Sequence, residues 1–115
     1  MAVDRLKSRI WVQAQIRMCD IAHLPAVVVK RGDPDAGAII LRLSRLDGTC
    51  HVFTQARTAS GAAAWAKASG ADAEGRLADD AADAYIARQR KFDPDLWILE
   101  IEDPERRYLL DAEIL

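Results

Sequence analysis

Several features that identify common protein classes are missing from this 115-residue chain. It has no uninterrupted run of about 18 apolar residues, the minimum for a membrane-spanning helix. Its first residues lack the apolar core and small-residue cleavage site of an export signal, so we predict a cytoplasmic protein. It contains only two cysteines, Cys19 and Cys50. In a chain without an export signal we expect both to be reduced, buried thiols.

The net charge is also small. The chain has sixteen Lys and Arg residues and eighteen Asp and Glu residues, so its formal net charge is −2. That balance excludes binding of nucleic acid or of an anionic membrane by the whole surface. The length fits a single domain over residues 1–115, large enough to fold without disulfides or metal ions.

The sequence patterns predict an α+β fold: a single antiparallel sheet of about five or six strands, with two helices packed on one face. The predicted strands are short segments, β-branched or alternating, bounded by turn-forming residues: Ala26–Lys30, Ala38–Arg45, Cys50–Thr54, Ala62–Ala66, Leu96–Glu102 and Arg107–Leu110. Short connections among the first three predict a meander. The Ala-rich and Gly-rich segment Ala59–Ala78 is weakly specified, and its Ala62–Ala66 stretch also fits a helical turn.

Two segments are predicted to be helical. The first, Asp4–Leu24, alternates in a way that also fits a strand, but its length without Gly or Pro favours a helix. One stripe of that helix is apolar: Ile10, Ala14, Met18 and Ile21. The second, Asp79–Phe92, has acidic residues in its first turns and basic residues in its last, as the helix dipole favours. Its predicted inward stripe ends at Phe92.

The residues that could hold a metal ion do not make a convincing site. Cys19 and His23 are one helical turn apart, and Cys50 and His51 are adjacent on a predicted strand. Neighbouring strand residues point to opposite faces, so Cys50 and His51 cannot both reach one zinc ion. We therefore predict no metal and no cofactor.

A catalytic arrangement is equally hard to find. Glu100 and Glu102 share one face of a strand, and paired carboxylates can divide acid and base roles. An enzyme with an acidic site around Asp33, Glu100 and Glu102 is one alternative, and it requires the loop and the strand to converge. No Lys, His or activated nucleophile accompanies the glutamates, so the sequence favours a protein that is not an enzyme.

Charge is distributed unevenly along the chain. Residues 1–57 hold nine basic and five acidic residues, whereas residues 58–115 hold seven and thirteen. A basic surface made of Arg9, Arg17, Lys30 and Arg31 supports a second alternative, a nucleic-acid-associated module. The same split suits docking to a charged protein or association between copies of the chain.

The favoured hypothesis is a non-catalytic domain that binds another protein or itself. Trp65 lies in the weakly specified Ala-rich stretch and is the tryptophan that we expect to be partly exposed, although packing in the core is the favoured alternative for it. An exposed tryptophan is an effective interface anchor, so Trp65 is the candidate binding residue for a protein partner.

Three stretches of the sequence also carry a family resemblance: Asp83–Asp103 with its Asp-Pro-Asp-Leu-Trp block, Val29–Ala38, and Leu46–Gly48. Together they resemble a small uncharacterised alphaproteobacterial family, catalogued as domain of unknown function 1491. The resemblance covers nearly the whole chain. It implies a stand-alone cytosolic bacterial protein of about this length, and it implies no reaction, cofactor or catalytic residue.

Overall fold

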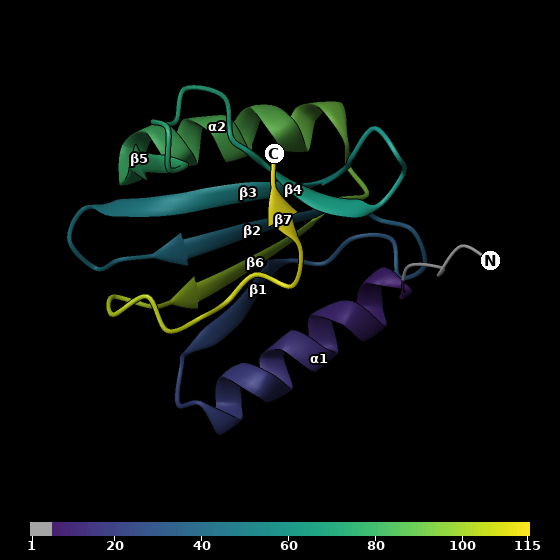
Figure 1. Cartoon of the computed structure of the whole chain (residues 1–115), viewed down its shortest axis with the longest axis horizontal. Coiled ribbons are helices and arrows are strands. Elements are labelled where there is room, and N and C mark those ends of the chain that lie inside the picture. The colour runs from purple at the N-terminus through teal and green to yellow at the C-terminus, as the bar shows by residue number, and fades with distance from the viewer. Residues whose placement is uncertain (1–5) are drawn as a thin grey trace.

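The structure, a computed structural model, describes residues 6–115 as two helices and seven strands (Figure 1). In chain order the elements are α1 (Ser8–Ile21), β1 (Ala26–Lys30), β2 (Ile39–Ser44), β3 (Thr49–Arg57), β4 (Ala63–Lys67), β5 (Arg76–Ala78), α2 (Asp79–Phe92), β6 (Trp97–Glu102) and β7 (Glu113–Ile114). The α+β prediction is confirmed, and α2 has the predicted bounds. The predicted start of the first helix, Asp4, lies outside the described residues. Within residues 6–115 no helix is long and apolar enough to span a membrane.

The sheet is mixed, with the strand order β1-β6-β2-β3-β4-β7 and with β5 also paired to β3. The predictions of a purely antiparallel sheet and of an initial three-stranded meander are wrong, because β6 lies between β1 and β2. β6 runs parallel to β2, and β7 runs parallel to β4. A parallel neighbour needs a long return connection, which the segment containing α2 supplies for β6.

The two helices cover opposite faces of the sheet (Figure 1). The prediction that both helices pack on one face is therefore wrong. The central strand β2 explains why: Ile39 and Leu41 pack in the cluster with α1, whereas Ile40 packs in the cluster with α2. A strand with apolar side chains on both faces of the sheet must be packed against other elements on both faces.

The face that α1 buries is not its most obvious apolar stripe. Trp11, Val12 and Cys19 are buried against the sheet. The stripe containing Met18 and Ile21 faces outward instead, and these two side chains are 58% and 73% exposed. On α2, Ala82, Tyr85 and Ile86 point inward as expected, but Phe92 at its end is exposed.

The C-terminal segment departs most from the predictions. Residues 107–110 form no strand; the chain instead crosses the α1 face and ends in β7, beside β4. The buried carboxylate of Asp103 is the cause. It accepts the backbone N–H groups of Arg107 and Tyr108, each at 2.8 Å, and so holds them in a turn rather than in a strand ladder.

The loop between β1 and β2 packs tightly against the start of β6. A Cβ atom added at Gly32 would lie 2.1 Å from the carbonyl oxygen of Asp95. The Asp33 N–H donates to that same oxygen, and the Trp97 indole donates to the Asp33 carbonyl. This contact ties the end of β1 to the adjacent strand, which fixes the position of the sheet edge described next.

Candidate functional site

β1 is the last strand on its side of the sheet, and within residues 6–115 no other strand pairs with its outer edge. Its inner edge pairs antiparallel with β6, with Val28 opposite Leu99. Burial alternates along it, so that Ala26 and Val28 join the cluster beneath α1. Val27 and Val29 face the α2 side, where they are 60% and 50% exposed. The strand therefore presents both an open backbone edge and two solvated valines.

A groove of about 420 Å³ lies on the α2 side of this edge. Val29 and Ile98 contribute apolar side chains from the sheet, and Ile86 and Arg90 contribute from α2. The groove exists because α2 packs mainly over β3 and β5 and leaves the β1 end of the sheet open. Its polar end is formed by Arg42 and its carboxylate partners.

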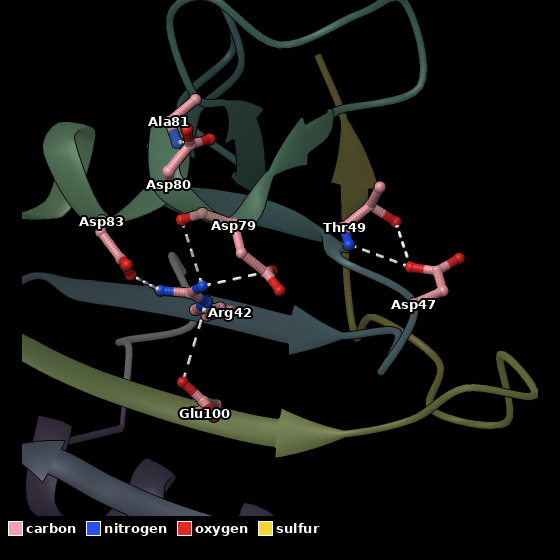
Figure 2. Close-up of polar contacts among 8 residues, drawn as sticks. All are labelled: Arg42, Asp47, Thr49, Asp79, Asp80, Ala81, Asp83 and Glu100. Atoms are coloured by element: carbon pink, nitrogen blue, oxygen red, sulfur yellow. Dashed lines mark hydrogen bonds and ion pairs between the residues drawn. The ribbon is translucent and has the colours of Figure 1, made fainter.

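Arg42 rises from β2 into a set of three carboxylates (Figure 2). Its Nη1 lies 2.5 Å from Asp83 Oδ1, its Nη2 lies 3.3 Å from Asp79 Oδ1, and its Nε lies 3.7 Å from Glu100 Oε1. Nη2 also donates to the Asp79 carbonyl at 3.4 Å. Burial acts to lower the pKa of Arg42, but the hydrogen bond to Asp83 and the surrounding charges outweigh it and the pKa is raised. Arg42 thus anchors the first turn of α2 to the sheet, and among the described residues its buried Nε makes no hydrogen bond.

A second groove, of about 460 Å³, lies between α1 and β1 on the other face. Arg17 and Asp20 line its helical wall, and Pro25, Ala26 and Val27 line its strand side. Arg17 and Asp20 are three positions apart and therefore neighbours on the helix surface. Open grooves consequently flank β1 on both faces of the sheet.

Two of the predicted basic residues are bound to their own chain. The Lys30 ammonium donates to the Pro94 carbonyl at 2.6 Å and to the Leu96 carbonyl at 3.1 Å. The Arg31 guanidinium lies 5.7 Å from the centre of the Trp97 ring, within the range of a cation–π contact. Through these contacts Lys30 and Arg31 hold the end of β1 against the start of β6.

The other two predicted basic residues, Arg9 and Arg17, are both exposed on α1. They are eight residues apart, which is about two helical turns. The structure thus leaves two of the four predicted cations open to solvent, and a nucleic-acid role for them stays a prediction.

The prediction that Trp65 is partly exposed is wrong. Its side chain is only 2% exposed, and its indole N–H donates to Asp111 Oδ1 at 2.9 Å. Trp11 donates to the other oxygen of the same carboxylate, also at 2.9 Å, and the two rings are 5.6 Å apart. The C-terminal segment covers Trp65, a position that no sequence pattern predicts for it. It is a core residue rather than an interface anchor.

The acidic residues proposed for catalysis are spread along β6. Asp33 contacts residues 95 and 97 at the start of that strand, whereas Glu102 is its last residue. Five residues of extended strand, from 97 to 102, span roughly 16 Å. Glu100 lies between them and pairs with Arg42. These three residues therefore do not lie close enough together to form an acidic active site.

The cysteines that were considered and rejected as zinc ligands are separated as well. Cys19 is buried in the cluster beneath α1, and Cys50 in the cluster beneath α2, so the sheet lies between them. Both thiols are free and buried, as predicted. Burial raises the pKa of Cys50 to about 11, which leaves it protonated at neutral pH.

Sequence reasoning missed the open edge of β1, although one signal was present. Val27, Val28 and Val29 are consecutive, and a fully buried strand would also show such a run. Only the strand order reveals that the run lies at an edge. The Arg42 ion pairs were missed as well, because the carboxylates come from α2 and β6, far along the chain.

Comparison with known proteins identifies relatives over nearly the full length. A family model described as "Protein of unknown function (DUF1491)" matches residues 6–111. The crystal structure of a DUF1491 family protein from Caulobacter crescentus is 31% identical with a TM-score of 0.82, and the match covers 96% of this chain and 100% of that one. An NMR structure of a DUF1491 family protein from the same organism has 31% identity, a TM-score of 0.80 and coverage of 98% and 99%.

A third similar structure is the solution structure of a protein from A. tumefaciens. It has 30% identity, a TM-score of 0.72 and coverage of 95% of both chains. No curated protein matches this chain. The comparisons therefore supply a family and a fold without an activity.

Proposed function

The chain belongs to the DUF1491 family, and on that premise we propose that it is a non-catalytic binding domain that pairs with a second copy of itself along β1. The observation that carries the proposal is the open edge of β1, with two solvated valines and a groove on each face. An exposed sheet edge is a template for another strand, because its backbone N–H and C=O groups have no ladder partner.

A second copy fits this edge in a specific register. When two β1 strands pair antiparallel about Val28, Val27 of each copy lies opposite Val29 of the other. All four valines then lie on the α2 side of one continuous sheet, where cross-strand β-branched pairs are favourable. Solvated apolar surface on both copies is removed from water in one step.

Lysine commonly protects a sheet edge from such pairing. Here the Lys30 ammonium donates hydrogen bonds to the carbonyls of Pro94 and Leu96, so its charge is directed toward β6 and away from the outer edge of β1. The irregular register between Val28 and Lys30 twists the strand and limits the paired stretch to a few residues. These features favour a short, defined pairing over open-ended aggregation.

The charge pattern on α1 is self-complementary. Arg17 and Asp20 lie on the helical wall of the groove beside β1. The two-fold axis that pairs β1 with itself places α1 of both copies on the same face of the joined sheet. A two-fold axis also repeats each contact, so a charge of each sign is available from the α1 of both copies beside the joined edge.

The proposal includes a cytosolic location. Cys19 and Cys50 are both unpaired thiols in the described structure. Free thiols persist in the reducing cytosol. Cell fractionation of the native host checks this location, and recovery in a secreted fraction would contradict it.

Sedimentation equilibrium of the full chain tests the pairing. We expect the native protein to form a dimer that Val27→Lys returns to monomer, because the substitution places a charge among the four valines. Met18→Lys is the matched control: Met18 is 58% exposed and Val27 is 60% exposed, but Met18 lies on the outer face of α1.

The possible outcomes are distinct. A dimer that Val27→Lys dissociates and Met18→Lys leaves intact supports pairing through β1. A dimer that only Met18→Lys dissociates assigns the interface to α1 and overturns the proposal. A chain that stays monomeric at every concentration overturns self-pairing and leaves the edge open for a strand from a different protein. Circular dichroism confirms that each variant is folded.

A further inference from the structure

A group of basic side chains lies on the α1 face of the sheet, near the turn between β2 and β3. We name Arg45, His51, Arg76 and Arg106 the arginine–histidine cluster. Several contacts bring its members together. Arg45 Nε donates to His51 Nδ1 at 3.0 Å, and His51 lies directly opposite Arg76 on the neighbouring strand β5. The backbone N–H of Arg106 donates to the Asp103 carbonyl, which also accepts Arg45 Nη1 at 2.7 Å.

His51 is the most informative member of the cluster. It is only 4% exposed, and its ring stacks on Phe53 with 6.3 Å between the centroids. Because Nδ1 accepts a hydrogen bond from Arg45, the neutral imidazole carries its proton on Nε2. Within residues 6–115 that Nε2 donor has no hydrogen-bond partner. Nε2 is not among the buried nitrogens that lack a partner, so it reaches solvent, where an anionic acceptor can bind it.

Two of the three guanidinium groups also lack anions. Arg45 is paired with the fully buried carboxylate of Asp103, at 3.3 Å. Among the described residues no carboxylate oxygen lies within 4 Å of the side-chain nitrogens of Arg76 or Arg106. The Nε of Arg76 is buried and has no partner within the same residues.

Two acidic side chains whose charges act on Arg76 are already used by their own turns. Asp72 Oδ1 accepts the N–H groups of Glu74 and Arg76, both at 2.9 Å. Asp47 Oδ1 accepts the N–H and hydroxyl of Thr49. These contacts hold the carboxylates in the turns, where each acts on the Arg76 guanidinium through its charge only.

We propose that the arginine–histidine cluster is a binding site for a phosphate dianion. Arg76 and Arg106 supply two guanidinium groups that have no carboxylate within 4 Å among the described residues, and His51 Nε2 supplies a neutral hydrogen-bond donor. The planar fork of donors on arginine matches two phosphate oxygens at once, and charge-assisted hydrogen bonds of this kind are short and strong. Arg45 is a positioning residue, because its bond to Nδ1 fixes which imidazole nitrogen carries the proton.

The environment of His51 suits this role. Burial, followed by the charges of Arg45, Arg106 and Arg76, lowers the pKa of His51, so the ring is neutral at pH 7. The site is independent of the proposed self-pairing, since β6 and β2 separate β3 from β1 in the sheet.

Titration of the full-length chain with inorganic phosphate, followed by two-dimensional NMR, tests the site. Ionic strength is held constant with sodium chloride. We expect saturable shifts at the His51 ring and at the Arg76 and Arg106 side chains. Arg76→Gln and Arg106→Gln each weaken phosphate binding about tenfold or more, because each removes a charge-assisted hydrogen bond.

Arg57→Gln is the matched control. It removes the same charge from an exposed arginine at the far end of β3, whose Nη1 is bonded to the Gly61 carbonyl. Unchanged phosphate affinity in Arg57→Gln, with loss in the other two variants, supports the site. Equal weakening in all three variants shows general charge screening and overturns it, as does the absence of saturable shifts in the native chain.

A second titration distinguishes the sources of the phosphate group. Adenosine monophosphate carries the same dianion on a larger molecule. Tighter binding of the nucleotide than of inorganic phosphate, lost again in Arg76→Gln, assigns the site to a phosphomonoester. Equal affinity for both assigns it to the phosphate group alone. Binding of the nucleotide that Arg76→Gln leaves intact occurs elsewhere on the surface and contradicts the assignment to this cluster.

Discussion

Arg42 and Arg45 are three residues apart, yet they extend to opposite faces of the sheet and meet opposite surroundings. Arg42 lies within 4 Å of three carboxylates, and its side chain is 12% exposed. Arg45 has one carboxylate partner, Asp103, and its side chain is 9% exposed. The two arginines are almost equally buried, so burial of the cation does not distinguish them.

The two arginines differ in how exposed their carboxylate partners are. The carboxylates around Arg42 stay in contact with water: Asp79 is 41% exposed and Asp83 is 69% exposed. Asp103 is 0% exposed. If the arginine is removed, a solvated carboxylate regains water, whereas a buried one is left charged in a poorly polarisable interior. The comparison therefore predicts that the arginine with fewer partners contributes more to stability.

The largest expected effect is that of Arg45→Met. It leaves Asp103 buried without its cation, and removing one partner of a buried pair costs about 3–5 kcal/mol. Urea denaturation measures the loss in free energy of unfolding. A loss below about 1 kcal/mol, the range of exposed pairs, would contradict this account of Asp103.

A double variant sharpens this result. Asp103→Asn removes the stranded charge and keeps one acceptor oxygen; Arg107 and Tyr108 donate to different oxygens of Asp103, so one of the two N–H groups keeps its acceptor. We expect Arg45→Met/Asp103→Asn to be more stable than Arg45→Met alone, because no uncompensated charge is left buried. If the double variant is the less stable of the two, the backbone hydrogen bonds of Asp103 outweigh its charge.

The next largest effect is that of Arg42→Met. The substitution keeps the apolar stem against the sheet and removes the anchor of α2, for an expected loss of about 1–2 kcal/mol. The same urea experiment measures it beside Arg45→Met. A larger loss for Arg42→Met than for Arg45→Met would reverse the comparison and show that the number of partners decides.

The sequence predicts local structure far better than it predicts these two environments. The β-branched run Ala26–Lys30 and the charge-polarised helix Asp79–Phe92 have the predicted bounds. Both are determined by residues close together in the chain. Strand order depends on contacts between distant segments, and nothing near residues 26–30 indicates that β6 pairs there.

The candidate sites show the same limit. Trp65 and Asp111 are 46 positions apart, so no pattern around Trp65 reveals the carboxylate and the tail that bury it. The apolar stripe on α1 misleads for a different reason. The buried positions include Gln15, whose amide oxygen accepts the hydroxyl of Tyr108, so the inward face is partly polar. A hydrophobic pattern therefore points to the wrong side of the helix.

The pH dependence of stability follows from His51. Its pKa in the folded chain is lowered from 6.5, mainly by burial. As pH falls through about 6.5 the unfolded chain takes up the proton first, so the stability contributed by His51 is complete above that pH and is lost below it. We expect the free energy of unfolding to fall more steeply below pH 6.5 in the native chain than in His51→Gln. Parallel profiles for the two proteins would contradict a neutral, buried His51.

The smallest expected effect is that of Asp83→Asn, although its carboxylate makes the shortest ion pair in Figure 2, at 2.5 Å. Asp83 is 69% exposed, and an exposed pair typically contributes less than about 1 kcal/mol because water and salt compete for both charges. We expect a loss in that range that shrinks as salt is added. Asp80→Asn, one turn earlier on α2 and outside the Arg42 contacts, is the matched control. A loss as large as that of Arg42→Met would show that this one contact carries the anchoring of α2, and that distance rather than exposure ranks the ion pairs of this chain.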